Sequence, residues 1–298
     1  MSPPGDQASQ RVPWTIRDAA AGVVVLVLLT VGMSLALGSF VRFADEGLTG
    51  ESLLFLVSTF GALSGTIAIA RFAGASPAFL ARVALAVLLV IAAAVALSSG
   101  KGDDRQLFTL PIQLILTLAV VVMDIAVVIT FTVQKYRVTF AALGFVPPVG
   151  QYRVLGAFGI WLSGLGVIGL AMLVFEQLGV EVPTPPDNAS DALDSFGGQV
   201  VSAIIAVAIF VPVAEELFFR GFVLPALRTR FGVVASVGAS AMLFAIFHVD
   251  PGLYFPTFVL GAALGAIRVW TGSLWPSIMV HMTQNALALG LASGAFEL

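Results

Sequence analysis

Long apolar runs recur along almost the whole of this 298-residue chain, and they constrain its fold more than any other feature. A helix needs about 20 apolar residues to cross the ~30 Å hydrocarbon core of a bilayer. Because lipid offers the backbone no hydrogen-bond partners, runs that cross it must be helical. The sequence therefore predicts an all-α, polytopic transmembrane helical bundle of about eight or nine spans. The runs lie at 19–41, 53–70, 79–97, 107–133, 155–178, 199–227, 232–248, 256–270 and 274–292.

Composition excludes several other classes of protein. Only 10% of the residues are charged, against about 25% in an average soluble domain. The chain has no cysteine, so it can form neither disulfides nor thiolate metal sites. Its net charge of −3 leaves no basic surface for nucleic acid. The first run, 19–41, is too long for the core of a signal peptide, and we interpret it as a retained first span.

Charged residues between the runs alternate in sign along the chain. The segment 179–199 is acidic and contains no Lys or Arg, whereas Arg11, Arg17, Arg228 and Arg230 make other connecting segments basic. By the positive-inside rule, this pattern predicts a cytoplasmic N-terminus and an outward-facing 179–199 segment. The composition is compatible with a bacterial plasma membrane.

These features divide the chain into four regions. Residues 1–18 are polar and predict a disordered cytoplasmic tail. The N-terminal transmembrane helices occupy 19–178, and an acidic, proline-rich loop follows at 179–198. The last region, 199–298, is predicted to be helical and catalytic, because both histidines of the chain and the paired glutamates fall within it.

An unusual group of charges stands in the run 199–227, within the stretch VPVAEELFFRGFVLP. Residues four apart lie on one face of a helix, and adjacent residues lie about 100° apart. Glu216 can therefore reach Arg220 on its own helix, and the arginine holds that carboxylate charged. Glu215 faces elsewhere and is less well neutralised, which suits a general base.

Two further pairs with the same spacing follow. FAIFH places Phe244 one turn before His248, and HMTQN places His281 one turn before Asn285. The two members of each pair share one helix face, so His281 and Asn285 can address one point in space.

Counting along the helices tests whether these residues can meet. At a rise of ~1.5 Å per residue, Glu215 and His248 lie at similar depths, roughly 22–24 Å from the turn at 229–232. His281 lies only roughly 12 Å from the next turn on that side. A tilt or a kink, such as Pro212 could supply, must therefore bring His281 to the others.

Each of these features also has a structural explanation. A lone histidine in an apolar helix is usually a packed core residue, an asparagine can hold helices together, and a buried Glu–Arg pair can be purely structural. Ionisable groups inside a membrane are costly, however, and function is the first hypothesis for them. Because both histidines share a segment with the paired glutamates, the sequence favours a functional site. Asp124 is a second mid-span candidate with no evident partner.

The three patterns EExxxR, FxxxH and HxxxN, in this order, resemble the CPBP family of intramembrane proteases. That family comprises the type II CAAX prenyl endopeptidases and bacteriocin-processing or self-immunity (Abi-like) homologues. The resemblance covers residues 199–292 and includes the continuation FRGFVLPALRTRFG between the first two patterns. It implies an integral-membrane endopeptidase whose substrate is a membrane-associated peptide or protein, with the lipid bilayer as its surroundings and no nucleic-acid partner.

The resemblance also assigns roles to individual residues. Glu215 would activate water, and His248 would assist it. His281 and Asn285 would bind the oxyanion of the tetrahedral intermediate, as preorganised donors do in acyl transfer. Three further residues would support the geometry of the site: Glu216, Arg220 and Phe244.

The resemblance leaves a metal open, because the family has also been described as metalloproteases. Glu215, His248 and His281 match the ligand count of a catalytic zinc site. The sequence has no HExxH helix, however. We therefore prefer a metal-free glutamate mechanism, with zinc as the alternative and no cofactor established.

Two other function classes remain as alternatives. A non-catalytic membrane scaffold or immunity protein could share the same fold. An ion-coupled transporter could use Asp124, Glu215 and Glu216 as ion sites, but it should show inverted repeats with interrupted helices in both halves. The charges cluster in one half of the chain only, which counts against transport.

Overall fold

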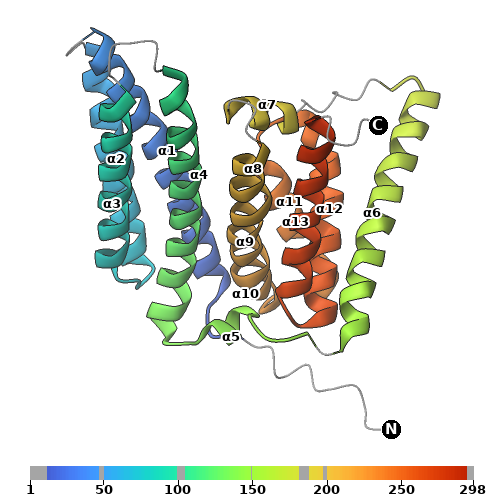
Figure 1. The fold of residues 1–298 in the computed structure, drawn as a ribbon. Coiled ribbons are helices and arrows are strands. Elements are labelled where there is room, and N and C mark those ends of the chain that lie inside the picture. Colours follow the sequence, from blue (N-terminus) through green and yellow to red (C-terminus); the bar gives the residue numbers. More distant parts are fainter. Residues whose placement is uncertain are drawn as a thin grey trace. The chain divides into compact units, whose positions relative to one another are not determined.

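A computed structural model describes most of the chain, and helices account for nearly all of the described residues (Figure 1). No strand occurs within these ranges: 12–46, 50–98, 105–148, 150–180, 188–196 and 200–293. The chain divides into two compact units. The first unit holds Met1–Ala19, Val138–Asn188 and Glu215–Thr283, and the second holds Ala20–Arg137, Ala189–Ala214 and Gln284–Leu298.

The predicted spans all coincide with helices, which confirms the all-α membrane bundle. Helical stretches long and apolar enough to cross a membrane are Ile16–Leu35, Leu114–Gln134, Tyr152–Gln177, Val200–Arg228 and Pro251–Thr271. Shorter apolar stretches are Val57–Phe72, Pro77–Ala86 and Val233–Phe247. The apolar runs of the sequence therefore located the helices correctly, and the protein is an integral membrane protein.

Three long helices form the frame of the first unit. They are α6 (Gln151–Gln177), α11 (Val233–Phe247) and α12 (Pro251–Thr271), and α12 packs against both of the others. Gly261 allows α11 and α12 to approach closely, because a Cβ at this position would lie 3.1 Å from the Cα of Ala241. Such close approach through a small residue is typical of helix packing in membranes.

A short connection ties the ends of these helices together. Helix α5 (Phe140–Leu143) ends at Gly144, whose φ of +105° an L side chain rarely adopts. The carbonyl of Gly144 accepts a hydrogen bond from the N–H of Leu274 at 2.8 Å, and the hydroxyl of Ser273 donates to the carbonyl of Val146 at 2.6 Å. The turn before α13 (Trp275–Ala292) is thereby bound to the segment that precedes α6.

The end of the predicted disordered tail is ordered instead. Trp14 is completely buried, and its indole N–H donates to the carbonyl of Phe222 at 3.0 Å. Asp18 accepts hydrogen bonds from the N–H and the hydroxyl of Thr15, at the start of α1 (Ile16–Glu46). One large aromatic side chain thus anchors a segment whose composition is otherwise polar, and residues 1–11 lie outside the described part.

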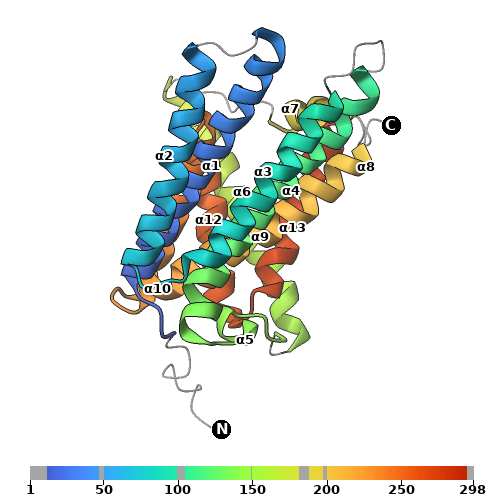
Figure 2. The ribbon, with the colours of Figure 1, turned by 90° about the vertical axis from the view of Figure 1, so that its left-hand side faces the viewer.

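The second unit contains α2 (Gly50–Phe72), α3 (Pro77–Ser98) and α4 (Arg105–Ile129), and α3 packs along α4 (Figure 2). The predicted loop 179–198 includes a helix, α7 (Asn188–Ser195), while 181–187 and 197–198 lie outside the described residues. The buried Phe196, just after α7, packs in a cluster with Ala203, Ala206, Ala208 and Leu289. This apolar anchor explains why the C-terminal part of a polar segment folds.

The predicted span 199–227 is not a uniform α-helix. It consists of α8 (Val200–Ala203), the π-helical segment η3 (Ile204–Phe210), α9 (Val211–Glu216), a second π-helical segment η4 (Leu217–Val223) and α10 (Leu224–Arg228). A π-helix bonds residue i to i+5 rather than i+4, and such segments are frequent at functional sites. The two π-helical segments flank α9, and η4 begins directly after the paired glutamates at its end.

We expect the Trp14 anchor to be measurable as stability. Trp14→Phe keeps most of the buried ring but leaves the Phe222 carbonyl without its donor, which should lower the unfolding free energy by about 1 kcal/mol. Trp14→Ala should lower it by about 3–5 kcal/mol. Denaturant unfolding of the purified protein in detergent measures both changes. Trp270→Phe, at a half-exposed tryptophan, is the matched control, and equal losses in the two Trp→Phe variants would contradict the anchor.

Candidate active site

The two adjacent glutamates occupy different environments at the end of α9. Glu216 is completely buried, whereas the side chain of Glu215 is 24% exposed. Neighbours on a helix differ in direction by about 100°, so one carboxylate enters the protein while the other remains accessible. This is the division that the spacing predicted, and it leaves Glu215 within reach of water.

Arg220 is the partner of Glu216, as predicted, but it does more than neutralise one carboxylate. Its Nη1 donates to Oε1 of Glu216 at 2.8 Å, and its Nη2 donates to the carbonyl of Gly261 at 3.0 Å. The guanidinium carbon lies 4.5 Å from the centre of the Phe244 ring. One completely buried side chain of η4 thus contacts both α11 and α12.

His281, from α13, lies between the two carboxylates. Its Nδ1 is 3.1 Å from Oε1 of Glu216, and its Nε2 is 3.6 Å from Oε2 of Glu215. A carboxylate can only accept, so a proton on Nδ1 is donated to Glu216. Nε2 then faces the accessible Glu215 at 3.6 Å, which is close enough for an electrostatic contact but too long for a direct hydrogen bond.

The depth count left a gap between His281 and Glu215, which a tilt or a kink had to close. The gap is closed, because Nε2 of His281 lies 3.6 Å from Oε2 of Glu215. The count assumed regular α-helices, and η4, between Glu215 and the turn after α10, is π-helical instead. The residue types of η4 are also found in α-helices, so the sequence does not reveal that this segment is π-helical.

His248 ends α11, and it contacts Phe244 in two ways. Its Nδ1 lies 2.9 Å from the Phe244 carbonyl, and its ring centre lies 4.7 Å from the Phe244 ring. A carbonyl accepts only, so Nδ1 carries a proton and donates it to the Phe244 carbonyl. The Phe244 ring also lies 5.7 Å from the ring of His281, so this aromatic side chain contacts both histidines.

Asn285 stands one turn after His281 on α13, in the part of the chain that belongs to the second unit. Its side-chain Nδ2 donates to the carbonyl of Val207 at 3.0 Å. In η3 the N–H of Val211 bonds to the carbonyl of Ala206, which sets an i to i−5 register. In the same register the carbonyl of Val207 would accept from the N–H of residue 212. Residue 212 is a proline and has no N–H. Asn285 supplies the missing donor.

The three residues considered as zinc ligands are not arranged as a ligand set. Among the described residues, no group of three or more His, Asp or Glu side chains could hold a metal ion. Nδ1 of His248 bonds to a backbone carbonyl and Nδ1 of His281 faces Glu216, so only the Nε2 atoms are open to a metal, as is common for histidine ligands. In this structure Glu215, His248 and His281 are therefore not assembled as a zinc ligand set.

Several residues that shape this cluster have no signal in the sequence. Gly261 contributes its carbonyl to Arg220, and Ser240 donates its hydroxyl to the carbonyl of Phe219 at 3.3 Å. Both contacts use backbone groups, which every residue type possesses. Asp124, the other sequence candidate, is buried in α4 of the second unit.

Comparison with known proteins supports the family resemblance. Residues 197–287 match the family model described as type II CAAX prenyl endopeptidase Rce1-like. The chain is also similar to an uncharacterized 24.3 kDa protein of Escherichia coli, at 26% identity over 154 residues that cover 50% of this chain and 69% of the relative. No solved structure matches the chain.

The contact of Asn285 with Val207 generates a test of its structural contribution. Asn285→Leu should lower the unfolding free energy by about 1 kcal/mol, because it leaves a carbonyl without a donor inside the helices. Pro212→Ala restores a backbone N–H in the right register, so it should stabilise the Asn285→Leu variant more than the unmodified chain. A double-mutant cycle by thermal unfolding in detergent measures this coupling.

The control for that cycle is Thr283→Val, which removes only a hydrogen bond within α13. Pro212→Ala should affect this variant no more than it affects the unmodified chain. Simple additivity of Asn285→Leu and Pro212→Ala would contradict the role given to Asn285.

Proposed function

We propose that this chain, which belongs to the CPBP/CAAX protease family through residues 197–287, is an integral-membrane endopeptidase that hydrolyses a peptide bond in or near the bilayer. The family match supports a CAAX-type membrane protease in general. The observation that supports the reaction most directly is the contact of the partly exposed Glu215 with the buried His281.

Glu215 is the general base in this proposal. It is the accessible member of the carboxylate pair, and its Oε2 faces an imidazole nitrogen at 3.6 Å. Glu215 takes a proton from water as the water oxygen adds to the scissile carbonyl carbon. The proton then passes to the peptide nitrogen as the C–N bond breaks, which yields a carboxylic acid and an amine. General-base catalysis of this kind contributes about 10²–10⁴-fold to a rate.

The buried pair holds His281 in position. Glu216 accepts from His281 Nδ1 and from Arg220, so neither the carboxylate nor the imidazole can rotate without losing a charge-assisted hydrogen bond. In this proposal both ring nitrogens of His281 carry a proton: Nδ1–H donates to Glu216, and Nε2–H stabilises the negative charge that forms on the carbonyl oxygen. A donor fixed in this way needs no reorganisation during the reaction.

The roles proposed for His248 and Asn285 use atoms that their contacts leave available. His248 assists with its Nε2, since Nδ1 is bonded to the Phe244 carbonyl. The Asn285 amide carries two N–H donors, and the carbonyl of Val207 takes one of them. The second N–H is the donor that the oxyanion would use.

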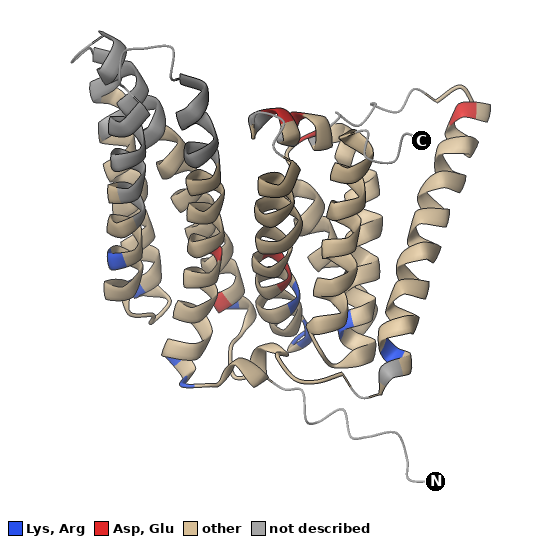
Figure 3. Ribbon diagram, viewed as in Figure 1, with Lys and Arg blue, Asp and Glu red and all other residues tan. Residues whose placement is uncertain are grey.

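The charge distribution supports an orientation of the first unit. Helix α6 has a basic residue at its start and an acidic residue at its end (Figure 3). Arg228 is the last residue of α10, and Arg230 follows it. Basic residues gather at the cytoplasmic ends of membrane helices. We infer that the N-terminus and these arginines face the cytoplasm, as in a bacterial plasma membrane.

Replacing the proposed base tests the reaction. Glu215→Gln keeps the size of the side chain but cannot accept the proton, so cleavage should fall by at least about 10²-fold while the protein remains folded. The measurement uses proteoliposomes with a library of lipid-anchored peptides, and mass spectrometry detects the new chain ends. Glu176→Gln, at an exposed carboxylate of the same unit, should cleave like the unmodified protein. Full cleavage by Glu215→Gln would refute the assignment.

Metal removal tests the alternative mechanism separately. Because the three residues do not form a ligand set, treatment with a zinc chelator should leave the cleavage rate unchanged. Elemental analysis of the purified protein should find no stoichiometric zinc. A loss of activity that added zinc restores would favour the metal-dependent mechanism.

A further inference from the structure

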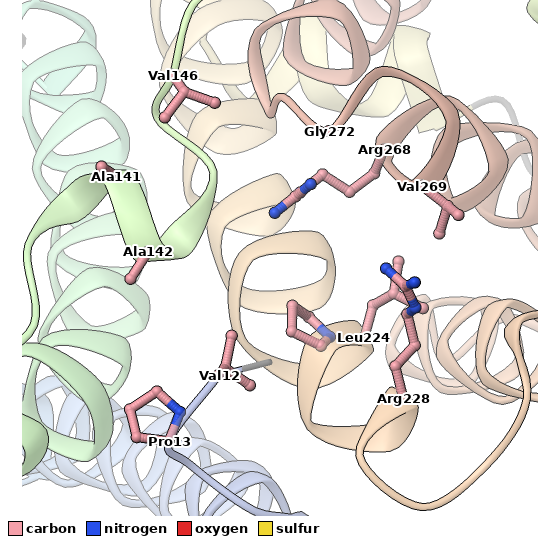
Figure 4. Close-up of a pocket in the computed structure, with 11 residues that line it drawn as sticks. Val12, Pro13, Ala141, Ala142, Val146, Leu224, Arg228, Arg268, Val269 and Gly272 are labelled. Carbon is pink, nitrogen blue, oxygen red and sulfur yellow. The ribbon is translucent and has the colours of Figure 1, made fainter. Parts of the chain in front are cut away.

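A cavity of about 290 Å³ lies at the ends of two membrane helices in the first unit. It is lined by the end of α10, the end of α12, part of α5 and the segment that precedes α1 (Figure 4). Two arginines line it, Arg228 from α10 and Arg268 from α12. The other lining side chains are apolar, so the two guanidinium groups are its only charges within the described part of the chain.

Arg268 is 8% exposed, which is unusual for a residue that cannot lose its charge. Its Nε has no hydrogen-bond partner among the residues that the structure describes. No carboxylate in those residues forms an ion pair with it either. A buried charge without a counter-charge is unfavourable, so an anion from outside the described chain would stabilise this guanidinium.

The backbone around Arg268 is shaped to hold the side chain in the cavity. Its guanidinium lies directly against Gly144, where an added Cβ would come within 2.6 Å of Nη2. The positive φ of Gly144 and its hydrogen bond to Leu274 fix this surface. The guanidinium occupies the space that a side chain at position 144 would fill, so the glycine at this position provides room for the arginine.

Arg228 adds a second positive charge to the same cavity. Its charge acts unfavourably on the charge of Arg268, as like charges in one cavity must. An anion between or beside the two groups removes this repulsion and provides acceptor oxygens. Arg matches the oxygens of a phosphate group particularly well, because its planar fork can donate two parallel hydrogen bonds.

We propose that this cavity binds a phosphate group, and its place in the membrane favours the headgroup of an anionic phospholipid. The spans Val200–Arg228 and Pro251–Thr271 both end at the cavity, which puts it at the level of the headgroups. Basic pockets between membrane helices on the cytoplasmic side bind such headgroups. A free phosphate ion offers the same chemistry from the aqueous side. The proposal is independent of the peptidase reaction.

The test counts lipids bound to the full chain. The purified protein is equilibrated with a mixture of phosphatidylcholine and phosphatidylglycerol, and native mass spectrometry measures how much of each lipid remains bound. We expect preferential retention of phosphatidylglycerol, which Arg268→Gln reduces roughly tenfold, a loss that corresponds to about 1.4 kcal/mol. Arg230→Gln removes an equal charge two residues beyond Arg228, at an exposed side chain, and should change retention by less than about twofold.

A second arm distinguishes the source of the phosphate. Inorganic phosphate is titrated into the protein in phosphatidylcholine nanodiscs, and thermal unfolding is followed. A rise in Tm that Arg268→Gln abolishes supports the site and assigns it to free phosphate. Lipid retention without this rise supports the site and assigns it to the headgroup. Arg228→Gln provides the same comparison if Arg268→Gln does not fold. The proposal is overturned if lipid retention and the response of Tm to phosphate are the same in all four proteins. These are the unmodified chain, the Arg230→Gln control and the two cavity variants.

Discussion

The buried guanidinium of Arg220 is the interaction on which the first unit depends. It bonds to Glu216 on its own helix, to the carbonyl of Gly261 on α12 and packs on the ring of Phe244 from α11. Removing one partner of such a group leaves an uncompensated charge and typically destabilises a protein by about 3–5 kcal/mol. The same contacts position Glu216, which in turn orients His281. Packing of the helices and orientation of the proposed catalytic groups therefore depend on the same side chain.

The sequence predicted those features that a regular helix determines. Apolar runs placed the helices, and the i, i+4 spacing predicted the contact of Glu216 with Arg220 and the separate direction of Glu215. It did not predict features that depend on irregular backbone. The count along regular helices left a gap between His281 and Glu215, whose facing atoms lie 3.6 Å apart, and the partner of Asn285 is a carbonyl of η3 that Pro212 leaves without a backbone donor. Such contacts belong to the backbone, and residue types alone do not reveal them.

The buried charged residues of this unit fall into two groups, which differ in whether a counter-charge lies beside them. Glu216, Arg220 and His281 face one another as opposite charges inside the protein, although Oε2 of Glu216 and Nε of Arg220 have no hydrogen-bond partner among the described residues. Arg268 is nearly as buried, its Nε likewise has no acceptor, and no carboxylate of the described residues pairs with its guanidinium. The contrast separates a self-contained charge network from a side chain whose counter-charge must come from elsewhere. For this reason we interpret the network of Glu216, Arg220 and His281 as part of a reaction site and the cavity at Arg268 as a binding site for an anion.

The π-helical segment η4 has a further consequence for direction. An α-helix turns by about 100° for each residue, so the register of η4 sets the angle between the side chains that precede it and those that follow it. Glu215 and Glu216 lie before η4, and Arg228 ends the helix that follows it. The irregular turns of one buried segment thus set the angle between the proposed base and the cationic end of the same membrane span.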